Sequence, residues 1–168
     1  ELIVVTPVLK KSSVWKRGAD MNMFETVRAI IGENVTNNPE EILSSQGMKI
    51  FFLPMVGIRG IYKAIHCIPM VFIDSNLDEH EQRFVMAHEL AHHLFHRGLN
   101  RVFLDRCTHM KTDCYEREAE LFAACLLCPE SSEYIFEGET YTDLAHRMGV
   151  SEYVAKLYYK EYSRLICN

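Results

Sequence analysis

Four histidines and one glutamate fall within fourteen residues, RFVMAHELAHHLFH, at positions 83–96. Two of the histidines, His88 and His92, are four residues apart, and Glu89 directly follows the first. On a helix, side chains at positions i and i+4 project from one face with their Cβ atoms about 6 Å apart. Two imidazole nitrogens can then bind one zinc ion at about 2.0–2.1 Å. The spacing therefore predicts that His88 and His92 are metal ligands.

Glu89 has a different predicted role. Its position directly after a ligand histidine puts its carboxylate beside the metal and not on it. Zinc lowers the pKa of a bound water from about 15.7 towards 7. A carboxylate beside that water can take its proton and later pass the proton to the leaving amine. The pattern H-E-x-x-H thus indicates a hydrolase with Glu89 as general base, and a surface cluster of histidines is the alternative.

A third ligand is needed, because a catalytic zinc site takes three protein ligands and a water. A metzincin would have a histidine at position 98, where this sequence has Gly98. His96 lies one turn beyond His92, and ligands from three successive turns would spread over about 12 Å, too far for one ion. We therefore expect His96 to orient a ligand or to pack in the core. His93 is about 100° around the helix from His92 and is not expected to bind metal.

A second predicted helix, YEREAELFAACLLCP, offers three carboxylates, Glu116, Glu118 and Glu120. Glu116 and Glu120 share one helical face, whereas Glu118 points elsewhere. A buried carboxylate needs a partner because an unpaired buried charge is costly, and a metal ion supplies one. We predict Glu116 as the third ligand and Glu120 as a group that orients a ligand histidine. The alternative is that all three glutamates are solvated.

These two segments together resemble the ImmA/IrrE family of zinc metallopeptidases. Members carry an H-E-x-x-H helix that usually ends in another histidine, followed by a helix similar to E-x-x-A-N-x-F-A-A-x-L-L-x-P. The resemblance covers residues 23–160 in the order of elements. This sequence has Glu120 where asparagine is common and Cys128 where methionine is common. The first difference bears on the hydrogen bonding around the metal ligands, and the second is a conservative change in packing.

The resemblance implies a zincin-like α+β fold. Its expected parts are a small antiparallel or mixed sheet, the H-E-x-x-H helix, a glutamate-bearing helix and a C-terminal helical pair. It also implies His88, His92 and Glu116 as ligands of Zn²⁺ and Glu89 as general base. Tyr115, Tyr141 and His146 remain alternative donors to the oxyanion that forms during peptide hydrolysis.

Family members cut a helix-turn-helix repressor at one site, which derepresses genes of a phage or mobile element. The resemblance therefore implies a site-specific endopeptidase whose partner is a protein substrate. The substrate could add as an extra strand to the sheet formed by residues 49–75. The alternative is a non-catalytic, zinc-stabilised regulator that binds a protein or DNA through its sheet edge or its C-terminal helices.

The elements expected to position these residues follow from the periodicity of the apolar residues and from the positions of Gly and Pro. We predict three strands in an antiparallel meander, a long helix capped by Asp78 and Glu81, and a second long helix that ends at Pro129. The helices are predicted at 23–31 with a break at Gly32, from Pro39 to Gly47, from about 79 to Gly98, at 114–128, and as a pair joined at 148–151. The strands are predicted at 49–54, 58–65 and 68–75.

The chain as a whole has 168 residues and a net charge of −5. We interpret residues 1–20 as an extension or added segment, and residues 21–168 as a single metallopeptidase domain. The tail, 140–168, has the spacing of a helix-turn-helix, but its small net charge favours packing over DNA binding. No segment is predicted to span a membrane, and the expected location is cytoplasmic.

Overall fold

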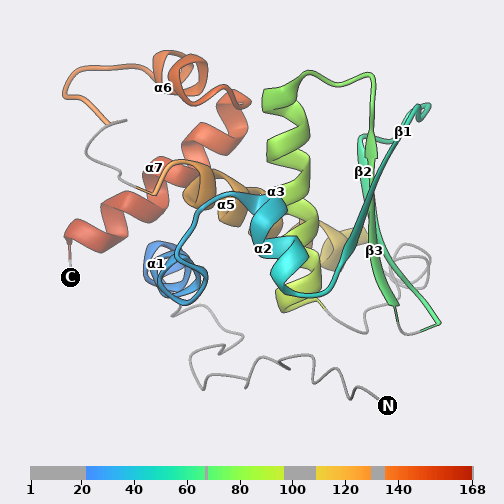
Figure 1. Cartoon of the computed structure of the whole chain (residues 1–168). Helices are drawn as coiled ribbons and strands as arrows, with labels where there is room; N and C mark the ends of the chain where they lie inside the picture. Colours follow the sequence, from blue (N-terminus) through green and yellow to red (C-terminus); the bar gives the residue numbers. More distant parts are fainter. Residues whose placement is uncertain (1–21, 67, 97–108, 130–134, 168) are drawn as a thin grey trace.

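The computed structural model describes residues 22–66, 68–96, 109–129 and 135–167, and these form an α+β fold. The sheet lies on one side of helix α3 and α7 lies on the other, while α5 crosses behind α3 and packs against it (Figure 1). The helices are α1 (Met23–Asn34), α2 (Pro39–Ser45), α3 (Glu79–Phe95), α5 (His109–Leu127), α6 (Tyr141–Met148) and α7 (Glu152–Ile166). The strands are β1 (Lys49–Leu53), β2 (Gly60–Ile65) and β3 (Ile68–Asp74).

The three predicted strands are present, but their predicted order as an antiparallel meander is wrong. The sheet order is β1-β3-β2, with β1 parallel to β3 and β2 antiparallel to β3. Strand β3 carries Val71 and Ile73, both fully buried, so the most apolar strand takes the centre. Within the described residues, β2 and β1 are therefore the two edges of the sheet.

Helix α1 runs past Gly32, where the sequence predicted a break. It ends instead at Asn34, and the following residue, Val35, adopts a left-handed conformation (φ 57°) and donates its backbone N–H to the Ile31 carbonyl. An exposed glycine inside a helix costs about 1 kcal/mol relative to alanine. The buried side chains of Phe24 and Val27 hold α1 against the core and outweigh that cost.

The helix that carries the histidines begins as predicted. The Asp78 side chain accepts the Glu81 backbone N–H, and the Glu81 side chain accepts the Asp78 N–H, which completes a capping box. Helix α3 ends at Phe95, and the predicted stop at Gly98 lies outside the described residues. Helix α5 begins five residues before the predicted 114 and ends two residues before Pro129.

The C-terminal helices pack onto the core. Helices α6 and α7 are joined at Gly149, whose φ of 65° is left-handed. The ring of Tyr158 is fully buried on α7, and its hydroxyl donates to the Cys128 carbonyl at 2.7 Å. The Tyr158 ring also meets the Phe24 ring edge to face, with 5.1 Å between their centroids. The inner face of α7 is thus core and not an exposed recognition surface.

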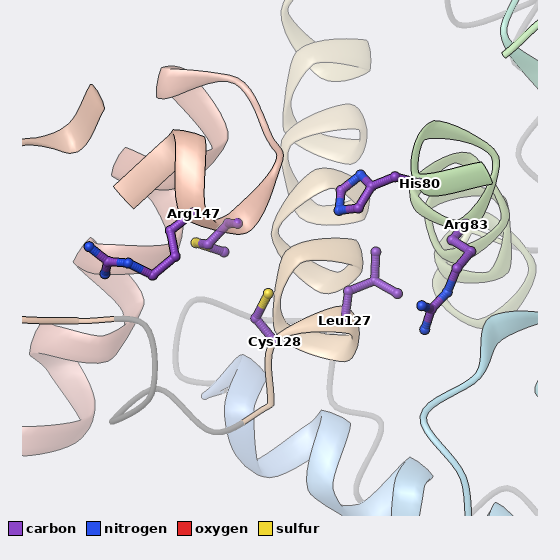
Figure 2. Close-up of a pocket in the computed structure, with 6 residues that line it drawn as sticks. His80, Arg83, Leu127, Cys128 and Arg147 are labelled. Atoms are coloured by element: carbon purple, nitrogen blue, oxygen red, sulfur yellow. The ribbon is translucent and has the colours of Figure 1, made fainter. Parts of the chain in front are cut away.

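A small cavity of about 170 Å³ lies where the start of α3 meets the end of α5 and α6. Figure 2 shows His80 and Arg83 on one side and Leu127 and Cys128 on another. Arg147 also borders it, but its guanidinium pairs with Glu139. None of the predicted metal ligands lines this cavity. Within the described residues, no helix is long and apolar enough to cross a membrane.

Candidate metal centre

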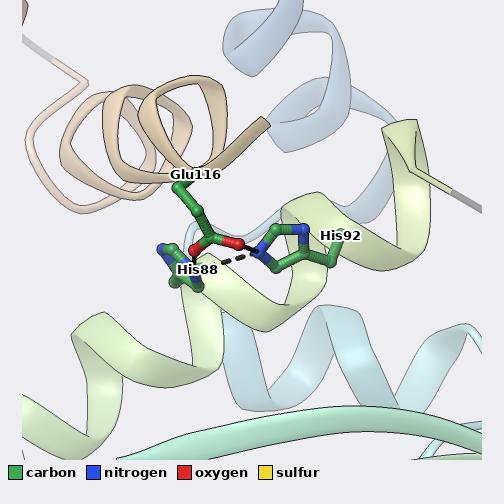
Figure 3. A group of neighbouring side chains, drawn as sticks. All are labelled: His88, His92 and Glu116. Atoms are coloured by element: carbon green, nitrogen blue, oxygen red, sulfur yellow. Dashed lines mark hydrogen bonds and ion pairs between the residues drawn. The ribbon is translucent and has the colours of Figure 1, made fainter. Parts of the chain in front are cut away.

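Three side chains predicted to be ligands meet between α3 and α5. His88 and His92 project from α3 towards Glu116 on α5 (Figure 3). The Nε2 atom of His88 lies 3.2 Å from Glu116 Oε2, and that of His92 lies 3.5 Å from Glu116 Oε1. The two Nε2 atoms are 3.0 Å apart. Among the described residues, this is the group of His, Cys, Asp and Glu that is arranged to hold a metal.

The donor set and its spacing fit a tetrahedral metal ion. Ligands at about 2.0–2.1 Å from zinc in tetrahedral geometry lie roughly 3.3–3.4 Å from one another. The three measured separations, 3.0, 3.2 and 3.5 Å, bracket that value. Each atom carries a lone pair when the carboxyl is ionised and each imidazole is neutral with its hydrogen on Nδ1. Bringing three lone pairs together is favourable when a cation lies between them.

Close packing of the two helices brings these ligands together. Ala91 on α3 and Ala119 and Ala123 on α5 are fully buried, and their small side chains let the backbones approach. At the far end of α3, the rings of Phe95 and Phe122 meet edge to face with centroids 5.3 Å apart. Burial of these apolar side chains helps to hold the two helices together beside the polar centre.

Glu89 lies on a different face of α3 from the two histidines. Its side chain is buried, and one carboxylate oxygen, Oε2, accepts the backbone N–H of Tyr62 at 2.7 Å. The Asp74 N–H donates to the Arg59 carbonyl, so β2 pairs with β3 through its odd-numbered residues. Tyr62 is even-numbered, and its backbone groups therefore point away from β3. Glu89 is thus fixed to the outer edge of β2.

Gly60 allows β2 to approach α3 this closely. A Cβ added at Gly60 would lie 2.3 Å from Val85 Cγ1 and 3.3 Å from the Phe72 carbonyl oxygen. Val85 is buried and β-branched, so its side chain has little freedom to move aside. A side chain at position 60 would therefore push the strand away from Glu89.

We expect Gly60→Ala to destabilise the protein by about 1–3 kcal/mol, the usual cost of overpacking. The displacement would also lengthen the hydrogen bond from Tyr62 to Glu89. Urea unfolding measures the first effect, and the amide chemical shift of Tyr62 reports the second.

Gly32→Ala is the matched control, because a Cβ there meets nothing within 4 Å and the residue is helical. Alanine at that position should stabilise the protein by up to about 1 kcal/mol. Equal stability of the Gly60→Ala variant and the wild type would contradict a tight contact between β2 and α3.

The carboxylate that contacts His96 is that of Glu118. Oε2 of Glu118 lies 2.8 Å from Nε2 of His96, so the expectation that Glu118 points elsewhere is wrong. Glu120 lies near His88 and Glu116. Burial raises the pKa of Glu120, the charge of His88 lowers it and that of Glu116 raises it further.

Two of the remaining histidines behave as the helical spacing predicts. His96 lies beside His92, with their Nδ1 atoms 2.9 Å apart, and it is outside the group of three. His93 is buried against the Tyr62 ring, with 5.2 Å between centroids. Both therefore support the arrangement around the centre.

The three candidates for oxyanion stabilisation separate in the structure. Tyr115 lies beside His96, and the two rings meet edge to face with 4.8 Å between their centroids. Tyr141 packs against Tyr159 on α7, and its ring lines a cavity between α6 and α7. His146 is exposed on α6. Of the three, Tyr115 is the one in contact with a histidine at the end of α3.

A largely buried H-E-x-x-H helix, a glutamate from α5 and a small sheet beside them are the arrangement expected of a metallopeptidase. The comparisons agree. The model of peptidase family M78, described as the IrrE N-terminal-like domain, matches residues 43–157. The chain belongs to this ImmA/IrrE family of metallopeptidases.

Two relatives illustrate the family. "Uncharacterized immunity region protein 2" of Bacillus phage phi105 is 32% identical over 148 residues, which cover 86% of this chain and 94% of that protein. "Metallopeptidase ImmA" of Bacillus subtilis (strain 168) is 31% identical over 101 residues, which cover 60% of each chain. The first similarity extends over nearly the whole relative, and the second over part of it.

Proposed function

We propose that the protein is a zinc-dependent, site-specific endopeptidase that cleaves a helix-turn-helix repressor of a phage or mobile element. The observation that carries the proposal is the convergence of His88, His92 and Glu116. Glu89, which directly follows His88 in the sequence, is buried. The names of the relatives support it, since one is a metallopeptidase and the other belongs to a phage immunity region. Cleavage of the repressor would derepress the genes it controls.

In this proposal His88, His92 and Glu116 hold the metal. Bound zinc would supply a Lewis acid that makes water a nucleophile near neutral pH. The Glu89 carboxylate would accept a proton from water and pass it to the leaving amine. The Tyr62 N–H holds the carboxylate in place, so little reorganisation is needed when the proton moves.

The edge of β2 is the proposed docking site for the substrate backbone. Gly60 and Ala64 turn their backbone groups away from β3, on the same edge where the Tyr62 N–H is bound by Glu89. An extended peptide that adds to this edge would bring its own backbone beside the centre. Alternate side chains of the peptide would then contact the protein and supply the selectivity that zinc chemistry lacks.

The test is intact-mass analysis of a helix-turn-helix repressor encoded beside the gene, incubated with the purified protein. We expect a single cut that is lost when a chelator removes the metal. If a zinc-loaded protein leaves the repressor intact, the endopeptidase proposal fails and the non-catalytic, zinc-stabilised regulator gains support.

A further inference from the structure

A chain of hydrogen bonds leads from the candidate metal centre to the side of α5. His92 faces the centre with Nε2, and its other ring nitrogen, Nδ1, lies 2.9 Å from Nδ1 of His96. The Nε2 atom of His96 lies in turn 2.8 Å from Oε2 of Glu118. Each imidazole therefore uses both of its ring nitrogens, and the chain ends on a carboxylate.

The carboxylate sets the direction of the hydrogen bonds. An ionised carboxylate accepts and cannot donate, so Nε2 of His96 carries the hydrogen in its bond to Glu118. In a neutral imidazole the other nitrogen, Nδ1, is then an acceptor. His92 must donate to it from its own Nδ1. This leaves the lone pair of His92 on Nε2, the atom that faces His88 and Glu116.

The opposite direction would disable the centre. If His96 donated from Nδ1, then Nδ1 of His92 would have to accept. A neutral His92 would carry its hydrogen on Nε2, where no lone pair would remain for a metal. The direction of the chain therefore decides whether His92 can be a ligand.

We infer that His96 and Glu118 are positioning residues that hold His92 in its metal-binding tautomer and orientation. This inference rests on the proposed function, in which His92 is a ligand. The side chain of His96 is 5% exposed, and the Tyr115 ring lies edge-on to it. A contact that merely joined α3 to α5 would not need a second nitrogen of His96 directed at His92.

The test compares three variants with the wild type. His96→Phe keeps a ring but removes the acceptor, and His96→Asn restores, in place of Nδ1, an amide oxygen that can accept from His92. Glu118→Ala removes the carboxylate, which is one-third exposed, so the fold should tolerate the change. Arg117→Ala, at an exposed position on the same turn of α5, is the control.

Two measurements distinguish a role in positioning His92 from a role in stabilising the fold alone. Competition with a chromophoric chelator gives the dissociation constant for Zn²⁺. Nitrogen chemical shifts of the metal-free protein report which nitrogen of His92 carries the hydrogen. Urea unfolding of the metal-free protein monitors the fold independently.

We expect His96→Phe and Glu118→Ala to weaken zinc binding by about 10–100-fold, the usual effect of removing a group that orients a ligand. His96→Asn should recover part of that loss, and Arg117→Ala should match the wild type. In Glu118→Ala the hydrogen of His92 should be distributed between Nδ1 and Nε2. If both loss variants fold and bind zinc within about twofold of the wild type, the positioning role is overturned. If the wild type binds no zinc, the proposed function itself fails.

Discussion

Replacing Glu89 with glutamine is expected to slow peptide cleavage by about 10²–10⁴-fold, the contribution typical of a general base. Glutamine has nearly the same shape, and its amide oxygen can still accept the Tyr62 N–H that now binds the carboxylate. It cannot take a proton from water at neutral pH. The chemistry should therefore be lost while the geometry is kept.

The measurement is single-turnover cleavage of the repressor, together with the zinc content of each protein. Glu79→Gln is a suitable control, since Glu79 is an exposed glutamate in the first turn of the same helix. We expect both variants to bind zinc and the control to cut at the wild-type rate. Wild-type cleavage by the Glu89→Gln variant would rule out Glu89 as the base.

Glu116→Gln is expected to weaken metal binding by more than about 100-fold. Removal of a group that merely orients a ligand costs about 10–100-fold, so losing a direct ligand should cost more. The carboxylate oxygens of Glu116 lie 3.2 Å from Nε2 of His88 and 3.5 Å from Nε2 of His92. A neutral amide in their place removes the negative charge that balances the cation.

Glu120→Gln is the matched comparison, because Glu120 lies one turn further along the same face of α5. Its charge acts on the centre from a half-buried position, and such a screened interaction is worth about 1 kcal/mol or less. We expect the affinity for zinc to change by about fivefold or less. Competition with a chelator measures both variants, and an equal loss in the two would mean that Glu116 and Glu120 had been assigned wrongly.

Several features depended on local sequence and were predicted from it. The capping box of Asp78 and Glu81 satisfies backbone groups within one turn, and the i, i+4 spacing puts His88 and His92 on one face wherever α3 lies. Pro39 likewise begins α2 as expected. These features need no knowledge of the rest of the chain, because the atoms that make them are four or fewer residues apart.

Features that balance a local preference against distant contacts were predicted less well. The break at Gly32 did not occur, since burial of the rest of α1 outweighs the weak helix propensity of one glycine. The three strands were predicted, but their order was not. Each strand is defined by its own pattern, whereas its neighbours depend on which strand the core covers most fully.

The sequence by itself determined which side chains of α3 can share a metal ion, because ligand types and their spacing on one helix are local properties. The tertiary structure decided how α3 is supported on its two sides. Glu116 and Glu118 are about 200° apart on an ideal helix, so spacing alone separated them. Yet Glu116 reaches His88 while Glu118 reaches His96, two turns further along α3. Likewise, the contact of Glu89 with the edge of β2 depends on how a strand 27 residues away packs against the helix. Such contacts arise from the relative rotation and distance of packed elements, which no short stretch of sequence encodes.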